Sequence, residues 1–146
     1  MAVYSHILLA ADFTPASETV SQQALQLRQV FKAQLCLVHV VEFTQMDLSN
    51  DLILPQDLEI DRELMELARQ RLQTLGEELG VDKAECFVSQ GSTRREILRL
   101  AEERNTDLIV IGSHGREGIQ RLLGSTANAV LHGAPCDVLA VRIKDE

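Results

Sequence analysis

Two short clusters of glycine and hydroxyl residues in the C-terminal third have the chemistry of a phosphate-binding site. They are Gly112-Ser113-His114-Gly115 and, after eight intervening residues, Gly124-Ser125-Thr126. Glycines let the backbone approach a ligand closely, and consecutive free amides can hold phosphate oxygens. The N-terminus of a helix following the second cluster would add a favourable dipole. Asp12, which follows the first apolar run, is an acceptor suited to ribose hydroxyls.

The same residues also have a purely structural interpretation. Gly112 and Gly115 could form a turn between a strand and a loop, and Ser125 could cap a helix. Glycine motifs are easily matched by chance, so spacing alone gives the two interpretations about equal weight. Arg116 and Arg121, which lie between the clusters, could offset phosphate charge in an otherwise acidic chain.

Patterns typical of enzymes are missing, and we expect no catalytic or metal site. The sequence has no GxxxxGK[ST], GxGxxG, HExxH or GxSxG motif. His114 is a lone loop histidine and His39 lies in an apolar strand, where a hydrogen-bonded core residue is expected. A phospho-receiver domain would need an acidic pair after the first strand and an aspartate ending the third. Here Asp12 stands alone and the third strand ends in Ser89-Gln90, so that alternative fails. A slow ATPase is a weaker third alternative, because no residue is evidently placed to activate water.

Strands and helices alternate along the chain and would position these residues. We predict strands at 6–10, 35–41, 85–89, 107–111 and 138–143, separated by helices at 15–32, 64–79, 93–105 and 119–131. Thr14-Pro15 is expected to cap the first helix, Gly80 to end the second, and Thr93 to open the third with a capping box completed by Glu96. Residues 44–56 are expected to form a long polar loop.

This βαβαβαβαβ order predicts the α/β class, with one doubly wound parallel sheet and right-handed crossovers. We find no linker or repeat, so residues 1–146 are expected to be one domain. Ligands of such sheets bind beyond the carboxyl ends of the strands, where the strand order reverses. If the first and fourth strands are neighbours, Asp12 and the Gly112 loop meet there.

Composition argues against some classes of partner and indicates a cellular location. The formal net charge is −8 and the chain has no Trp and one Tyr, which argues against nucleic acid as a partner. No apolar run is long enough for a membrane span, and no signal peptide is evident, so a cytoplasmic location is expected. The cysteines Cys36, Cys86 and Cys136 lack zinc spacing and should be reduced, mostly buried thiols.

Several separated motifs, in order, resemble the universal stress protein family over essentially the whole chain. They are ILLAADFTP at 7–15, LVHVV at 37–41, DLIVIGSHG at 107–115, Gly124-Ser125 and APCDVL at 134–139. The resemblance implies a Rossmann-like fold of the adenine nucleotide alpha hydrolase type with strand order 3-2-1-4-5. It also implies a cytoplasmic, dimeric stress-response protein, and many members bind ATP through G-x2-G-x9-G-[ST].

Carried over to this chain, the resemblance assigns ten residues to ATP, and we expect Mg²⁺ to accompany the nucleotide and offset its phosphate charge. Asp12 would hold the ribose, and the adenine would lie between three apolar positions, Ala10, Val40 and Ile111. Near the ribose and the phosphates would lie Gly112, His114, Gly115, Gly124, Ser125 and Thr126.

One spacing departs from the family motif and keeps a second hypothesis open. Eight residues separate Gly115 from Gly124, where the motif has nine. Residues 44–54 and the tail 142–146 are similar to a branch of the family that is not known for nucleotide binding. The alternative is therefore a dimeric interaction protein with a vestigial pocket.

The last predicted strand suggests how two copies would associate. Residues 138–141 are apolar on both faces and, in the order 3-2-1-4-5, lie at a sheet edge. An open apolar edge promotes pairing with another strand. We therefore expect a homodimer built on this strand, with further protein partners unknown.

Overall fold

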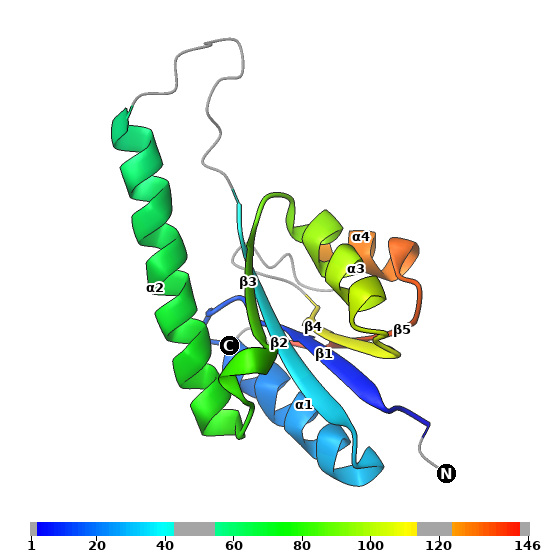
Figure 1. The fold of residues 1–146 in the computed structure, drawn as a ribbon. Helices are drawn as coiled ribbons and strands as arrows, with labels where there is room; N and C mark the ends of the chain where they lie inside the picture. The colour runs from blue at the N-terminus through cyan, green and yellow to red at the C-terminus, as the bar shows by residue number, and fades with distance from the viewer. Residues whose placement is uncertain (1–2, 43–54, 114–123, 144–146) are drawn as a thin grey trace.

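The computed structural model describes residues 3–42, 55–113 and 124–143 (Figure 1). One parallel sheet contains five strands, in the order β3-β2-β1-β4-β5. The strands are β1 (His6–Ala10), β2 (Gln34–Val41), β3 (Cys86–Gln90), β4 (Leu108–Gly112) and β5 (Asp137–Val141). The helices are α1 (Ser17–Phe31), α2 (Pro55–Leu79), α3 (Thr93–Glu103) and α4 (Ser125–Gly133), with a 3₁₀ turn η1 (Lys83–Glu85) before β3. This confirms the predicted fold class and strand order.

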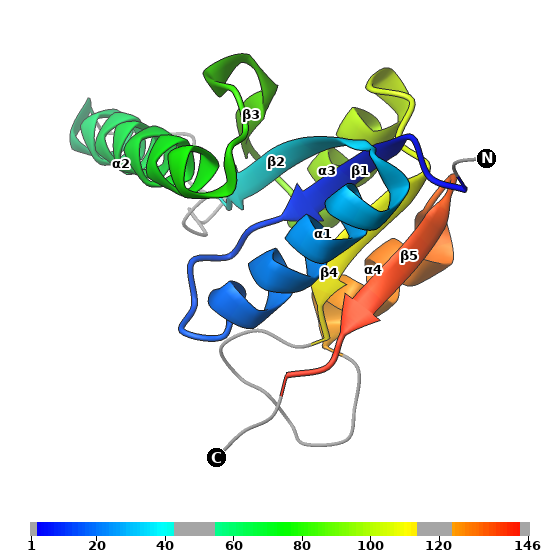
Figure 2. The same ribbon diagram turned by 90° about the horizontal axis from the view of Figure 1, so that it is seen from below.

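Helices cover both faces of the sheet, α1 and α2 on one side and α3 and α4 on the other (Figures 1 and 2). Successive side chains of β1 point to opposite faces of the sheet. Ile7 and Leu9 pack on the face covered by α1 and α2, whereas Leu8 packs on the face covered by α3 and α4. All three are almost completely buried. The near-continuous apolar runs predicted this two-sided burial.

The start of α1 differs from the prediction. Its N-cap residue is Ala16, not Thr14, and the Ser17 amide donates to the Thr14 carbonyl at 2.9 Å. The amide and hydroxyl of Thr14 both donate to Asp12, at 3.0 and 2.8 Å. Thr14 therefore closes the turn after β1, because Asp12 competes for the groups that a cap would use.

α3 begins at Thr93, as predicted, but its N-cap is one residue earlier than predicted. Ser92 is the N-cap, and its hydroxyl oxygen accepts a hydrogen bond from the Arg95 amide. Thr93 lies inside the helix and donates its hydroxyl to Glu42 at 2.6 Å. The predicted capping box at Thr93 and Glu96 is therefore wrong.

The other boundaries shift by a few residues, and α2 by more. α2 begins at Pro55, nine residues before the first predicted position, and Ile60, Leu64 and Leu67 on its first half are exposed. It ends as predicted, with Gly80 at a φ of 70° and the Val81 amide donating to the Gly76 carbonyl at 2.7 Å. Residues 119–123 of the fourth predicted helix lie outside the described residues. None of the helices in the described ranges is long and apolar enough to cross a membrane.

Candidate functional site

The carboxyl ends of β2, β1 and β4 lie side by side and carry a row of apolar side chains. Val40, Ala10 and Ile111 come from these three strands and belong to the same core cluster, on the α3 and α4 face of the sheet. Val40 and Ile111 are buried and Ala10 is half-buried. The three positions predicted to flank an adenine are therefore on one face, at one end of the sheet.

Asp12 stands at the exit of β1 with its carboxylate exposed. Both hydrogen bonds from Thr14 go to Oδ1, and no described residue donates to Oδ2. The next residue, Phe13, has a φ of 58°, a left-handed conformation that costs free energy for a residue with a side chain. The turn thus fixes one carboxylate oxygen and leaves the other available to a ligand hydroxyl.

His39 supports this turn from the opposite face of β2, a role that the sequence did not predict. Its Nδ1 lies 2.6 Å from the Ala11 carbonyl oxygen, which only accepts, so Nδ1 carries the proton and donates it. Its ring packs on Phe13 with centroids 4.3 Å apart, and the Arg71 guanidinium lies 5.9 Å from the Phe13 ring centre. The pKa of His39 is lowered, mainly because the ring is partly buried and also because Arg71 is nearby. The hydrogen bond to Ala11 and the charge of Asp12 raise this pKa but do not outweigh the burial. The predicted hydrogen bond of His39 is confirmed, whereas its side chain is half-buried rather than part of the core.

The structure brings Ser113 of the first glycine cluster next to Gly124 of the second, at the end of β4. The Gly124 amide donates to the Ser113 carbonyl at 2.6 Å. Gly112 is the last residue of β4, and Ser125 and Thr126 open α4. Among the described residues, no side chain caps the first turn of α4, and that turn has no acidic residue. Amides at such a helix N-terminus favour an anion.

The glycine conformations bear on the structural interpretation of the motif. Among the glycines in the described ranges, only Gly80 and Gly91 have a positive φ. Gly124 has a φ of −60° and a ψ of 154°, which any L-residue can adopt. A left-handed turn therefore does not explain Gly112 or Gly124. His114 and Gly115, with Arg116 and Arg121, lie outside the described residues.

Ser113 links the site to β5, which sequence reasoning did not foresee. Its amide donates to the Val141 carbonyl at 2.8 Å, and its hydroxyl oxygen accepts from the Ile143 amide at 3.1 Å. β5 consequently ends at Val141, two residues before the predicted end, because Ile143 bonds to a side chain. The residue that follows Gly112 thus holds the last strand of the sheet.

The cysteines are free thiols, as predicted, although Cys86 and Cys136 are half-buried and only Cys36 is buried. Burial raises the pKa of Cys36 to about 11. Within the described residues, no group of three His, Cys, Asp or Glu could hold a metal ion.

Comparisons with known proteins agree with the fold and the motifs. Two universal stress protein A homologs of Coxiella burnetii are similar to this chain: homolog 1 is 37% identical and homolog 2 is 40% identical, each over 142 residues. The alignments cover 97% of this chain in both cases, with 99% and 97% of the relatives.

Solved structures show the same architecture. Hypothetical protein MJ0577 superposes with a TM-score of 0.81 at 23% identity, covering 98% of this chain and 99% of that one. UspA from Lactobacillus plantarum gives a TM-score of 0.74 at 25% identity, covering 97% and 100%. The profile of the Universal stress protein family matches residues 4–142, and the chain belongs to this family.

Proposed function

We propose that this universal stress protein binds an adenine nucleotide, ATP with Mg²⁺, at the carboxyl ends of β1 and β4. The observation that carries the proposal is the meeting of three features at one end of the sheet. These are the apolar row on β2, β1 and β4, the available oxygen of Asp12, and the uncapped N-terminus of α4. Each suits one part of a nucleotide, in the order base, ribose and phosphate.

The proposed contacts follow that order. The base packs on the row formed by Ala10, Val40 and Ile111, and the ribose hydroxyls donate to Asp12. The phosphates approach Gly124, Ser125 and Thr126, which lie before and within the first turn of α4. Further contacts come from the first glycine cluster, through Gly112, His114 and Gly115. Mg²⁺ would be bound mainly by the phosphate oxygens, because this ion keeps several waters and needs few protein ligands. A universal stress protein of this fold, 22% identical, has been solved in complex with cAMP.

A nucleotide held there would act on β5 through Ser113, which bonds to both Val141 and Ile143. We propose that β5 forms the interface of a homodimer and that the bound nucleotide stabilises this surface in a cytoplasmic signalling or protective module. The eight-residue spacing between Gly115 and Gly124 favours a second candidate, a dimeric interaction protein that binds no nucleotide.

Two measurements separate these candidates. Mass spectrometry of the small molecules released from the purified protein by acid is expected to detect an adenine nucleotide. Calorimetry with MgATP on protein freed of that ligand is expected to show saturable binding. If no nucleotide is released and no heat is measured, the nucleotide proposal is wrong and the second candidate stands.

A further inference from the structure

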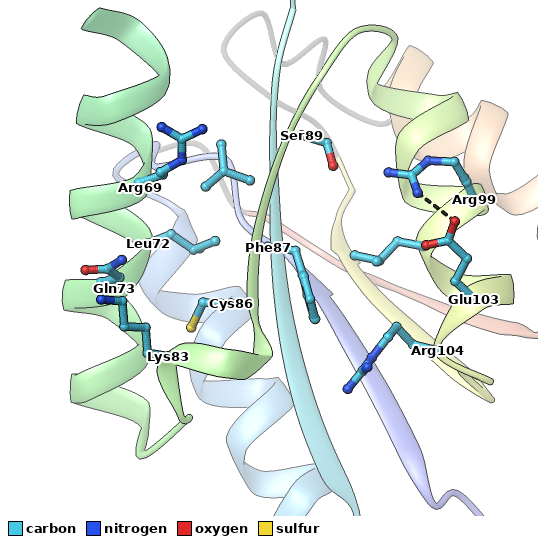
Figure 3. Close-up of a pocket in the computed structure, with 12 residues that line it drawn as sticks. Arg69, Leu72, Gln73, Lys83, Cys86, Phe87, Ser89, Arg99, Glu103 and Arg104 are labelled. Atoms are coloured by element: carbon cyan, nitrogen blue, oxygen red, sulfur yellow. Dashed lines mark hydrogen bonds and ion pairs between the residues drawn. The ribbon is translucent and has the colours of Figure 1, made fainter. Parts of the chain in front are cut away.

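The outer edge of β3 has no partner strand among the described residues. Side chains from both faces of the sheet flank this edge. β3 is the last strand of the sheet and pairs only with β2. A cavity of about 680 Å³ lies along it, between α2 with η1 on one side and α3 on the other (Figure 3). Unpaired strand edges of this kind can accept an additional strand.

The side of the cavity formed by α2 and η1 carries uncompensated positive charge. The Lys83 ammonium makes no hydrogen bond or ion pair with any described residue. Within the described ranges, Arg69 pairs only with Glu66, at 3.4 Å, and both side chains are more than half exposed, at 52% and 61%. Exposed pairs of this kind are weak, so Arg69 can exchange Glu66 for another carboxylate. Figure 3 shows both cations on this side.

The side formed by α3 is different, because its charges are already paired. Arg99 binds Glu96 and Glu103, each at 2.8 Å. Arg104 pairs with Glu85 and lies over the Phe87 ring, 5.2 Å from its centre. Phe87 itself is half-buried and points to this side of the sheet. This side therefore offers the Phe87 ring among paired charges that leave little net charge.

We propose that the β3 edge binds an extended segment of a partner protein in which acidic residues alternate with apolar ones. Successive side chains of an added strand point to opposite faces of the sheet. Carboxylates at alternate positions would meet Lys83 and Arg69, and the apolar residues between them would pack toward Phe87. The net charge of −8 repels acidic segments elsewhere, which restricts binding to this local positive region.

A second copy of β3 does not fit this surface. Cys86–Gln90 reads CFVSQ and has no carboxylate to offer to Lys83 or Arg69. The site also lies at the opposite end of the strand order from β5, so it is independent of the proposed dimer and of the nucleotide proposal.

The test is fluorescence anisotropy of a short labelled peptide in which glutamate and valine alternate. We expect saturable binding that weakens as salt is added. The variant R69E/K83E should weaken binding about tenfold or more, because losing two weak charge contacts together lowers the affinity by about that factor. The matched control is Arg62→Glu, an exposed residue of α2 outside the cavity, which should leave the affinity unchanged. Circular dichroism would verify that each variant is folded.

Two control peptides test the strand geometry: one with lysine for glutamate, and one of the same composition with the glutamates grouped together. Both should bind at least about tenfold more weakly. The proposal is overturned if the grouped peptide binds equally well, if R69E/K83E binds like the wild type, or if a single-stranded oligonucleotide competes fully. It is also overturned if sedimentation shows that this double substitution abolishes self-association of the protein.

Discussion

At the scale of single residues, the position of Asp12 depends on side chains that are distant in sequence. Phe13 keeps its left-handed conformation while its ring packs on His39, and His39 in turn binds the Ala11 carbonyl. A strained backbone persists only where its surroundings enforce it. His39 therefore supports the site although it lies on the face of the sheet opposite to Val40.

This arrangement predicts a pH dependence of stability. Burial lowers the folded-state pKa of His39, so below about pH 6.5 the unfolded chain binds more protons than the folded one. The contribution of His39 to stability is complete above that pH and is lost as the pH falls toward the depressed value. Urea unfolding at about pH 8 and about pH 5 measures it.

The control is His39→Gln, which keeps a donor for the Ala11 carbonyl and does not titrate. We expect a smaller loss of stability on acidification than in the wild type. An identical loss in both proteins would assign the pH dependence to other groups.

Asp12→Ala is expected to weaken MgATP binding by about ten- to a hundredfold, because one hydrogen bond to a charged group contributes about 1.5–3 kcal/mol. Calorimetry measures the affinity, and Glu63→Ala, an exposed carboxylate of α2, is the matched control. An unchanged affinity would mean that Asp12 only closes the turn with Thr14.

At the scale of elements, the apolar patterns predicted which segments form the sheet, whereas the pairing of β1 with β4 followed from the family resemblance and is confirmed by the strand order. The patterns did not predict the capping residues of α1 and α3, because local hydrogen bonds decide them. Thr14 donates to Asp12, and Ser92 caps α3 in place of Thr93. Neither the role of His39 nor that of Ser113 could be predicted. His39 depends on how the β1 exit folds onto β2, and Ser113 on the register of β5.

The N-terminus of α4 gives a prediction about the phosphates. Gly124→Val should abolish nucleotide binding while the fold survives, because the backbone angles of Gly124 suit valine but its side chain would obstruct the first turn. Gly124→Ala, with a smaller side chain, should lose less affinity. Calorimetry and circular dichroism measure binding and fold, and an unfolded valine variant would show that Gly124 is required structurally.

The contact between α2 and β3 gives a prediction about stability. A methyl group on Gly76 would lie 2.7 Å from Sγ of Cys86 and 3.1 Å from the Val81 carbonyl oxygen. Gly76→Ala should therefore destabilise the protein by about 1–3 kcal/mol despite alanine's better helix propensity. Urea unfolding measures the change.

The same substitution should cost clearly less in a Cys86→Ala background, where Sγ is removed. Cys136→Ala, which changes a half-buried thiol near β5, is the control and should give no such relief. Additive effects in both backgrounds would show that Cys86 does not limit the approach of α2.

At the scale of the whole molecule, β5 is the second open edge of the sheet and differs from β3 in chemistry. A cavity of about 550 Å³ beside it is lined largely by apolar and aromatic side chains, among them Tyr4, Phe31, Leu131 and Leu139. Leu131 is 46% exposed. The β5 edge thus suits an apolar self-interface, whereas the β3 edge suits a charged partner.

We expect light scattering at micromolar concentration to show a dimer, and Leu131→Asp or Leu139→Asp to shift it toward monomer. Burying a charge without a partner opposes association. Leu131 is the safer variant because it is exposed in one copy of the chain. Ile60→Asp, at an equally exposed position on α2, is the control. A monomeric wild type would remove the dimer proposal.

The central place of β1 also affects how this protein is made. Ile7 pairs with Leu35 on one side and with Leu108 on the other, and Asp107 binds the amides of Ser5 and His6. Because synthesis proceeds from the N-terminus, β1, α1 and β2 can assemble early. The other edge of β1 stays unpaired until β4 has been synthesised. For most of the time on the ribosome, the central strand of the finished sheet has an open edge. Protection of the nascent chain from aggregation thus depends on how soon residues 107–112 emerge.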